Sequence, residues 1–84
     1  MKHLKNHIDD IHAIDDIIDA LDHARTKHPG PASMADRVAA LTEEVGEVAR
    51  AYLDKEGVDR IREEAAQVAA VAIRIMTEHE TDDS

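Results

Sequence analysis

The sequence predicts an all-α protein: a three-helix protomer, with one long N-terminal helix and an antiparallel helical hairpin, that oligomerises into a helical bundle. Apolar residues recur at helical spacing in three segments, which a Pro-Gly stretch and a short polar break separate. The apolar content is Ile, Val, Leu and much Ala, and Tyr52 is the only aromatic residue. An 84-residue chain with so few large side chains buries a small core by itself. We therefore expect residues 1–84 to form one domain whose core a second copy completes.

The N-terminal helix is expected over residues 1–28, with its regular part from Leu4 to Lys27. Its apolar positions repeat at intervals of seven residues, which is two helical turns. These positions are Leu4, Ile11, Ile14, Ile18 and Leu21. The sequence HPGP at residues 28–31 should end the helix, because proline has no backbone N–H and glycine loosens the turn.

The helical hairpin is expected over residues 33–79. Ser33 is the predicted N-cap of its first helix, and Asp36 follows three residues later, as in a capping box. Residues 54–57 form a short break before the second helix. The predicted apolar stripes are Met34, Val38, Leu41, Val45, Val48 and Tyr52 on the first helix, and Val58, Ile61, Ala65, Val68, Ala72 and Met76 on the second. A short link between two amphipathic helices favours an antiparallel hairpin.

The net charge of −9 argues against nucleic acid or an anionic membrane surface as a partner, since phosphate backbones require clustered Lys and Arg. The absence of cysteine excludes disulfides and thiolate metal sites. No apolar run has the length of a signal peptide or of a membrane span. We expect a cytoplasmic protein that binds cations or is kept soluble by its charge.

An acidic motif occurs twice, as EEVGEVA at residues 43–49 and as EEAAQVA at residues 63–69. The two copies are 20 residues apart, and Glu47 of the first copy becomes Gln67 in the second. At about 100° per residue, the motif acids lie beside the apolar stripes and not opposite them. Their neighbours on this flank are small or apolar, so the carboxylates would face a partly desolvated space.

Four of these side chains border the core of the expected hairpin: Glu44, Glu47, Glu64 and Gln67. Carboxylates that converge in such a place repel one another, and a hard divalent cation relieves the repulsion. Mg²⁺ takes oxygen ligands and keeps water and substrate phosphates in its shell. Acids three residues apart on facing helices are a geometry that helical bundles use for metals. The alternative is that they are solvated glutamates of Ala-rich helices.

The segments LTEEVGEVA, from Leu41, and REEAAQVAAVAIRI, from Arg62, resemble the MazG-like nucleotide pyrophosphohydrolases of the all-α NTP pyrophosphatase superfamily. The family pattern is EExxE on one helix and EExxD on the next, and the resemblance covers Ser33 to about Met76. It implies a helical dimer or dimer of dimers that uses Mg²⁺, with Mn²⁺ as a substitute. It also implies hydrolysis of (deoxy)nucleoside triphosphates to a monophosphate and pyrophosphate.

The resemblance also assigns roles by position. The implied metal ligands are Glu44, Glu47, Glu64 and, more weakly, Gln67; the implied catalytic acids are Glu43 and Glu63. Gln67 stands where the family has Asp, and an amide oxygen ligates a cation without neutralising it. This departure leaves a non-catalytic nucleotide-binding or protein-interaction relative as the alternative, and a plain acidic helical oligomer as a third interpretation. Candidate contacts to substrate phosphates near the helix ends are Lys27, Arg37 and Lys55.

The six histidines offer a rival metal site. His3 with His7, His12 with Asp16, and Asp19 with His23 are each one helical turn apart, a spacing that suits Zn²⁺ or Ni²⁺. The three pairs do not converge on one point of the predicted helix. We therefore expect them not to form a dedicated metal site.

Overall fold

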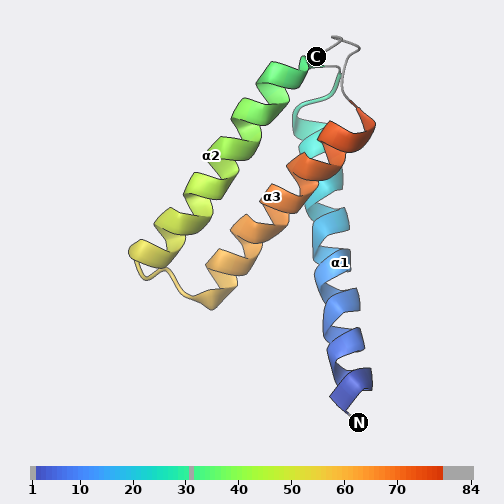
Figure 1. Ribbon diagram of the computed structural model, residues 1–84, viewed down its shortest axis with the longest axis vertical. Helices are drawn as coiled ribbons and strands as arrows, with labels where there is room; N and C mark the ends of the chain where they lie inside the picture. Colours follow the sequence, from blue (N-terminus) through green and yellow to red (C-terminus); the bar gives the residue numbers. More distant parts are fainter. Residues whose placement is uncertain (1, 31, 79–84) are drawn as a thin grey trace.

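The computed structural model describes residues 2–30 and 32–78, with side chains from residue 8 onward. Within these residues the protein consists of three helices and no strand: α1 (Lys2–Lys27), α2 (Met34–Leu53) and α3 (Val58–Thr77). Figure 1 shows α2 and α3 as an antiparallel hairpin, with α3 between α2 and α1. α3 packs against both neighbours, whereas the backbones of α1 and α2 do not approach each other closely in the described part of the chain. The predicted all-α, three-helix fold is thus confirmed.

The ends of the hairpin helices follow from local side-chain and backbone chemistry. The Ser33 hydroxyl accepts a hydrogen bond from the Asp36 N–H at 3.1 Å, so the predicted N-cap is present. At the other end of α2, the Glu56 N–H donates to the Ala51 carbonyl at 3.0 Å. The chain then turns through Lys55 and Gly57, whose φ angles are 56° and 97°. Glycine adopts such an angle at little cost, which explains Gly57 directly before α3.

The buried core is small and consists of small side chains. Ala20 and Leu21 of α1 pack against Ala70 of α3, with the half-buried Ala66 and Ile73 beside them. Alanines at this contact let the two helix backbones approach closely. Because only the C-terminal part of α1 takes part, the rest of α1 extends beyond the hairpin (Figure 1).

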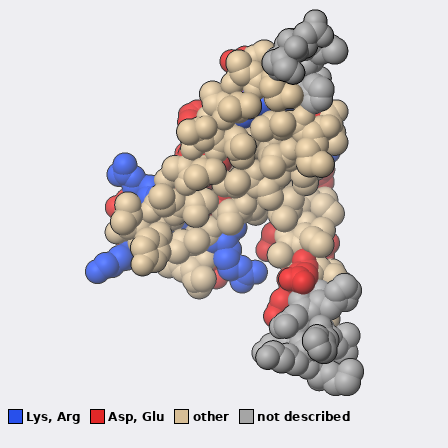
Figure 2. Space-filling view, in the orientation of Figure 1, with Lys and Arg blue, Asp and Glu red and all other residues tan. Residues whose placement is uncertain are grey.

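The apolar stripe predicted for the core of the hairpin lies partly at the surface. On α2, Val38, Val45 and Tyr52 are 48%, 52% and 71% exposed, and they follow one another at intervals of seven residues. Other large apolar side chains at the surface are Ile8, Ile11, Ile14, Ile18, Leu53, Val58 and Met76. α1 does not cover this stripe, because it packs against the face of α3 that carries Ala66, Ala70 and Ile73. Figure 2 shows a broad face of uncharged side chains with charged ones at its edges.

The buried positions of the hairpin are instead small or charged: Arg37, Ala51, Glu64, Ala70 and Arg74. Buried charges are costly unless they are paired, so these side chains mark the part of the fold where chemistry is expected. None of the described helices is long and apolar enough to cross a membrane.

Candidate metal centre

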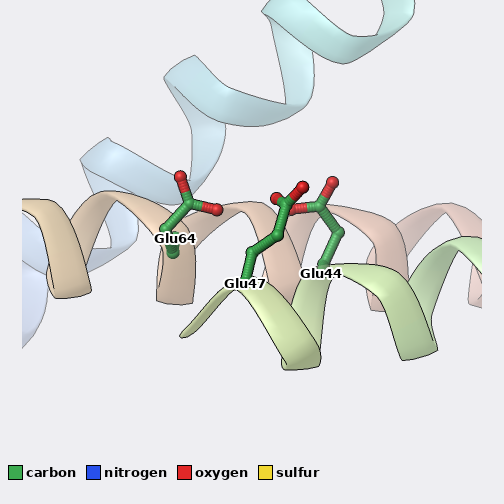
Figure 3. Close-up of side chains that lie close together, drawn as sticks. All are labelled: Glu44, Glu47 and Glu64. Atoms are coloured by element: carbon green, nitrogen blue, oxygen red, sulfur yellow. The ribbon is translucent and has the colours of Figure 1, made fainter. Parts of the chain in front are cut away.

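Three carboxylates from the two hairpin helices converge at one point. Glu44 and Glu47 come from α2 and Glu64 from α3, and each offers an oxygen within 4.8 Å of the others. Figure 3 shows the three side chains on the same side of the hairpin, with Glu47 between Glu44 and Glu64. Glu64 is buried, Glu44 is half-buried and Glu47 is exposed. We call these three residues the glutamate triad; among the described residues they are the group of three or more side chains spaced to hold a metal ion.

The geometry follows from the antiparallel register. Residues equally distant from the α2–α3 turn lie at the same level of such a hairpin, which pairs Glu47 with Glu64 and Glu44 with Gln67. Glu44 and Glu47 are three residues apart and therefore share a helix face. The repeat of the motif after 20 residues thus brings its acids together across the hairpin.

The environment of the glutamate triad disfavours its charged form. Burial raises the pKa of Glu44, and the charge of Glu47 and a hydrogen bond with it raise this pKa further. The pKa of Glu64 is raised by burial and by a hydrogen bond with Glu47, which outweigh the opposite effect of Arg60. Oε2 of Glu44 and Oε2 of Glu64 are buried and have no hydrogen-bond partner in the described structure. Two buried carboxylate oxygens of the glutamate triad therefore lack a hydrogen-bond donor within the described structure.

One arginine partly compensates the negative charge. Nη2 of Arg60 lies 2.8 Å from Oε1 of Glu64, as expected for residues four apart on a helix. The same guanidinium also pairs with Glu63 at 3.1 Å and with Glu56 at 3.7 Å, and its side chain is half exposed. A shared, solvated arginine cannot neutralise three carboxylates. The oxygen ligands, their spacing and their unpartnered atoms fit a hard divalent cation such as Mg²⁺.

The glutamate triad lines a cleft of about 600 Å³ that all three helices bound. α2 contributes Asp36, Arg37, Ala40, Glu43, Glu44 and Glu47; α3 contributes Arg60, Glu64, Gln67, Val71 and Arg74; α1 and its end contribute His23, Ala24, Lys27 and His28, with Ala32 beyond. Arg37 and Arg74 lie at the same level of the hairpin by the register given above. The cleft therefore runs from an acidic end, past Gln67, to a basic end.

Most of the predicted site residues line this cleft, and two do not. Glu43, Gln67, Lys27 and Arg37 join the glutamate triad around it. Glu63 faces a different depression, which Asp16, Asp19, Asp59 and Arg62 also line, and it pairs with Arg60. Lys55 lies in the α2–α3 turn and is not among the cleft residues.

Arg74 is a structural residue that the sequence analysis missed. Its Nη1 and Nη2 donate to the carbonyls of Ala24 and His28 at 3.3 and 2.9 Å, which fastens the end of α1 to α3. Its Nε donates to Glu78 at 3.0 Å. The spacing could have identified it, because Arg74 follows Gln67 by seven residues and so lies on the same face of α3.

Glu78 joins two arginines at the basic end. Burial alone would raise the pKa of Glu78, but hydrogen bonds from Arg25 and Arg74 outweigh it and lower this pKa. Arg25 donates to Oε2 and Arg74 to Oε1, so both oxygens are engaged. Arg37 is a third guanidinium beside them, with Nη2 3.8 Å from Oε1 of Glu78.

None of the described histidines joins a group with metal-ligand spacing. His23 and His28 line the basic end of the cleft, and His12 is exposed. The predicted pair of His3 and His7 has side chains outside the described part.

No family model, curated protein sequence or solved structure matches this chain. The resemblance to MazG-like proteins therefore rests on the motif residues quoted above.

Proposed function

We propose that the protein is a MazG-like, Mg²⁺-dependent pyrophosphohydrolase that converts (deoxy)nucleoside triphosphates to a monophosphate and pyrophosphate. The observation that carries the proposal is the convergence of Glu44, Glu47 and Glu64 within 4.8 Å in a cleft bounded by three helices. The doubled motif that predicts this chemistry is the motif that supplies all three residues. We further propose that the protein works in the cytoplasm, where its substrates and Mg²⁺ are available.

Different residues of the cleft would bind the cation and accept the proton. The glutamate triad would hold the cation, with Mn²⁺ as a substitute for Mg²⁺. A bound Mg²⁺ would supply charge neutralisation for the substrate phosphates and a lowered pKa for a water molecule. Glu43 is exposed at the cleft, one residue before Glu44, and is placed to accept a proton. We assign this role to Glu43 in preference to Glu63, because Glu63 does not line the cleft and is paired with Arg60.

The test is pyrophosphate release from a panel of nucleoside triphosphates with Mg²⁺, for the native chain and for Glu64→Gln. We expect turnover that this substitution lowers by about 100-fold or more, because losing even an outer-shell partner of a metal ligand costs about 10- to 100-fold. Arg50→Met, on the exposed surface of α2 and outside the cleft, is the control. Equal turnover of all three proteins would refute the proposal.

The second candidate is a nucleotide-binding relative without turnover, and Gln67 favours it. This residue lies level with Glu44 where the family pattern has an acid, so the cleft offers three carboxylates and one amide. An amide brings no charge and is a poor base. Saturable binding of a non-hydrolysable nucleotide, together with no pyrophosphate release for any triphosphate, would favour this candidate. Turnover would exclude it.

We also propose that a second copy of the chain is a partner. The exposed stripe of Val38, Val45 and Tyr52 continues over about four helical turns along α2, as a helix–helix seam requires. A monomer with large apolar side chains in such a row would be prone to associate. A second copy would also bring another Tyr52, the aromatic residue that could stack on a base.

A further inference from the structure

The basic end of the cleft lies two helical turns from the glutamate triad. Arg37 precedes Glu44 by seven residues on α2, so both share a helix face and their backbones are about 10 Å apart along the axis. Arg74 faces Arg37 from α3 at the same level, and Lys27 reaches the cleft from the end of α1. In a protein with a net charge of −9, such a concentration of positive charge requires an explanation.

Two of the three arginines at this end are already engaged. Arg74 uses Nε, Nη1 and Nη2 for hydrogen bonds to Glu78, to the Ala24 carbonyl in α1 and to the His28 carbonyl just after it. Arg25 uses Nε for the other oxygen of Glu78. Each oxygen of Glu78 thus already accepts one hydrogen bond from an arginine.

Arg37 is the arginine that remains. It is 8% exposed, and its Nε and Nη2 have no hydrogen-bond partner within the described structure. The nearest carboxylate oxygen, on Glu78, is 3.8 Å from Nη2, beyond hydrogen-bond distance. A buried guanidinium is costly when two of its nitrogens lack hydrogen-bond acceptors and its ion pair is as long as 3.8 Å.

The charges around Arg37 do not balance. Arg25, Arg37 and Arg74 surround one carboxylate, that of Glu78. Lys27 and Asp36 also line the cleft near them, and their opposite charges cancel. Counted over the described residues, the basic end therefore carries an excess of about two positive charges, which the dianion of a phosphate group would match. Because Arg37 belongs to the first turn of α2, the positive end of that helix dipole adds to the same field.

We propose that the basic end of the cleft is a phosphate subsite in which Arg37 is the principal donor. A guanidinium presents its N–H groups in a planar fork that matches two phosphate oxygens. The subsite is separate from the glutamate triad and binds its ligand without a divalent cation. The inference deepens the proposed function, since the phosphate would belong to the nucleotide bound in the same cleft, but its test requires neither Mg²⁺ nor turnover.

The experiment titrates inorganic pyrophosphate into the full chain in EDTA and a chloride buffer, and follows the ¹⁵N-labelled arginine Nε–H signals by NMR. We expect a saturable shift of the Arg37 signal. Arg37→Met should weaken binding by about tenfold or more, and Arg37→Lys by less, because the ammonium keeps the charge and loses the fork. Arg50→Met, an exposed arginine of the same helix and outside the cleft, should bind pyrophosphate as the native chain does.

Two further ligands separate the sources of the phosphate. A nucleoside monophosphate that shifts the Arg37 signal at lower concentration than pyrophosphate identifies a nucleotide-borne group, and the reverse order identifies free pyrophosphate. A nucleoside without phosphate should leave the signal unchanged, and a shift with it would overturn the proposal. So would an unmoved Arg37 signal in the native chain, a result that stands even if Arg37→Met does not fold. Mg²⁺ titrations of two variants keep the proposals apart, since Glu47→Gln, in the glutamate triad, should abolish Mg²⁺ binding and Arg37→Met should preserve it.

Discussion

Without a metal ion, Glu47→Gln should be more stable than the native chain. Once Mg²⁺ is present, the native chain should be the more stable of the two. Glu47 is the central member of the glutamate triad and raises the pKa of both Glu44 and Glu64. The substitution keeps the shape of the side chain and removes one negative charge. Its amide also gains two N–H groups that can donate to the neighbouring carboxylates.

The size of the effect follows from the geometry. Two unit charges at 4.8 Å repel by about 0.9 kcal/mol at the permittivity of water and by about 3.5 kcal/mol at an effective permittivity of about 20. Because Glu47 is exposed, the lower value applies to each of its two pairs, and we expect the free energy of unfolding in EDTA to rise by about 1–2 kcal/mol. For a chain of this size that corresponds to a Tm increase of about 5–10 °C.

Mg²⁺ should reverse the order. A ligand at 100 times its Kd stabilises the native state by about 2.7 kcal/mol, and only the native chain would bind the cation. Thermal unfolding followed by circular dichroism, in EDTA and over a Mg²⁺ series, measures both effects. Glu43→Gln is the matched control, because it makes the same change one residue before Glu44 and outside the glutamate triad; its stability should change by no more than about 0.5 kcal/mol. The reasoning would be refuted if Glu47→Gln had a lower Tm in EDTA than the native chain. It would also be refuted if Mg²⁺ stabilised Glu47→Gln and the native chain equally.

Three further predictions concern pH, packing and association. In EDTA, denaturant titrations should show stability rising as the pH falls from about 7 towards 4.5, because the raised pKa values of Glu44 and Glu64 let the folded state bind more protons than the unfolded chain. Below pH 4.5 stability should fall, because the pKa of Glu78 is lowered in the folded state and its protonation there breaks its ion pairs. A stability that falls steadily from pH 7 downward would contradict this prediction. Arg74→Met should cost roughly 3 kcal/mol, as loss of a buried charged partner does, and an unchanged Tm would show that α1 is held in another way. Val45→Lys should shift sedimentation velocity profiles towards the monomer, and identical profiles for both proteins would remove the α2 stripe as the interface between copies.

The helices and the glutamate triad could be predicted from the sequence because both depend on local rules. The cap at Ser33 and the break at residues 54–57 are matters of backbone chemistry, and the structure places both where the sequence does. Predicting the glutamate triad also required the antiparallel arrangement of the two hairpin helices. Once the hairpin is antiparallel, acids that border the apolar stripe on both helices must come together near the same level.

The packing of α1 could not be predicted in the same way. A helical stripe shows that a flank is apolar, but not which neighbour covers it, because that depends on contacts between residues far apart in the sequence. The pairing of Ala20 and Leu21 with Ala70 decides the docking, and alanines give a weak periodic signal. Arg74 shows the same limit: its partners are carbonyls of α1, which no sequence pattern reveals before the docking is known.

The position of Gln67 along the α2–α3 hairpin suggests a role that the motif alone does not. Gln67 lies at the same level of the hairpin as Glu44. On one side of this level are Glu47 and Glu64, and on the other side are Arg37 and Arg74. A carboxylate at this position would add a fourth negative charge opposite Glu44, whose pKa burial and its neighbours already raise. The amide avoids that repulsion, and its two ends can offer an oxygen to a cation and N–H groups to a phosphate. Glutamine at this position would therefore suit the proposed ligand, whose phosphate chain would extend from the glutamate triad towards Arg37.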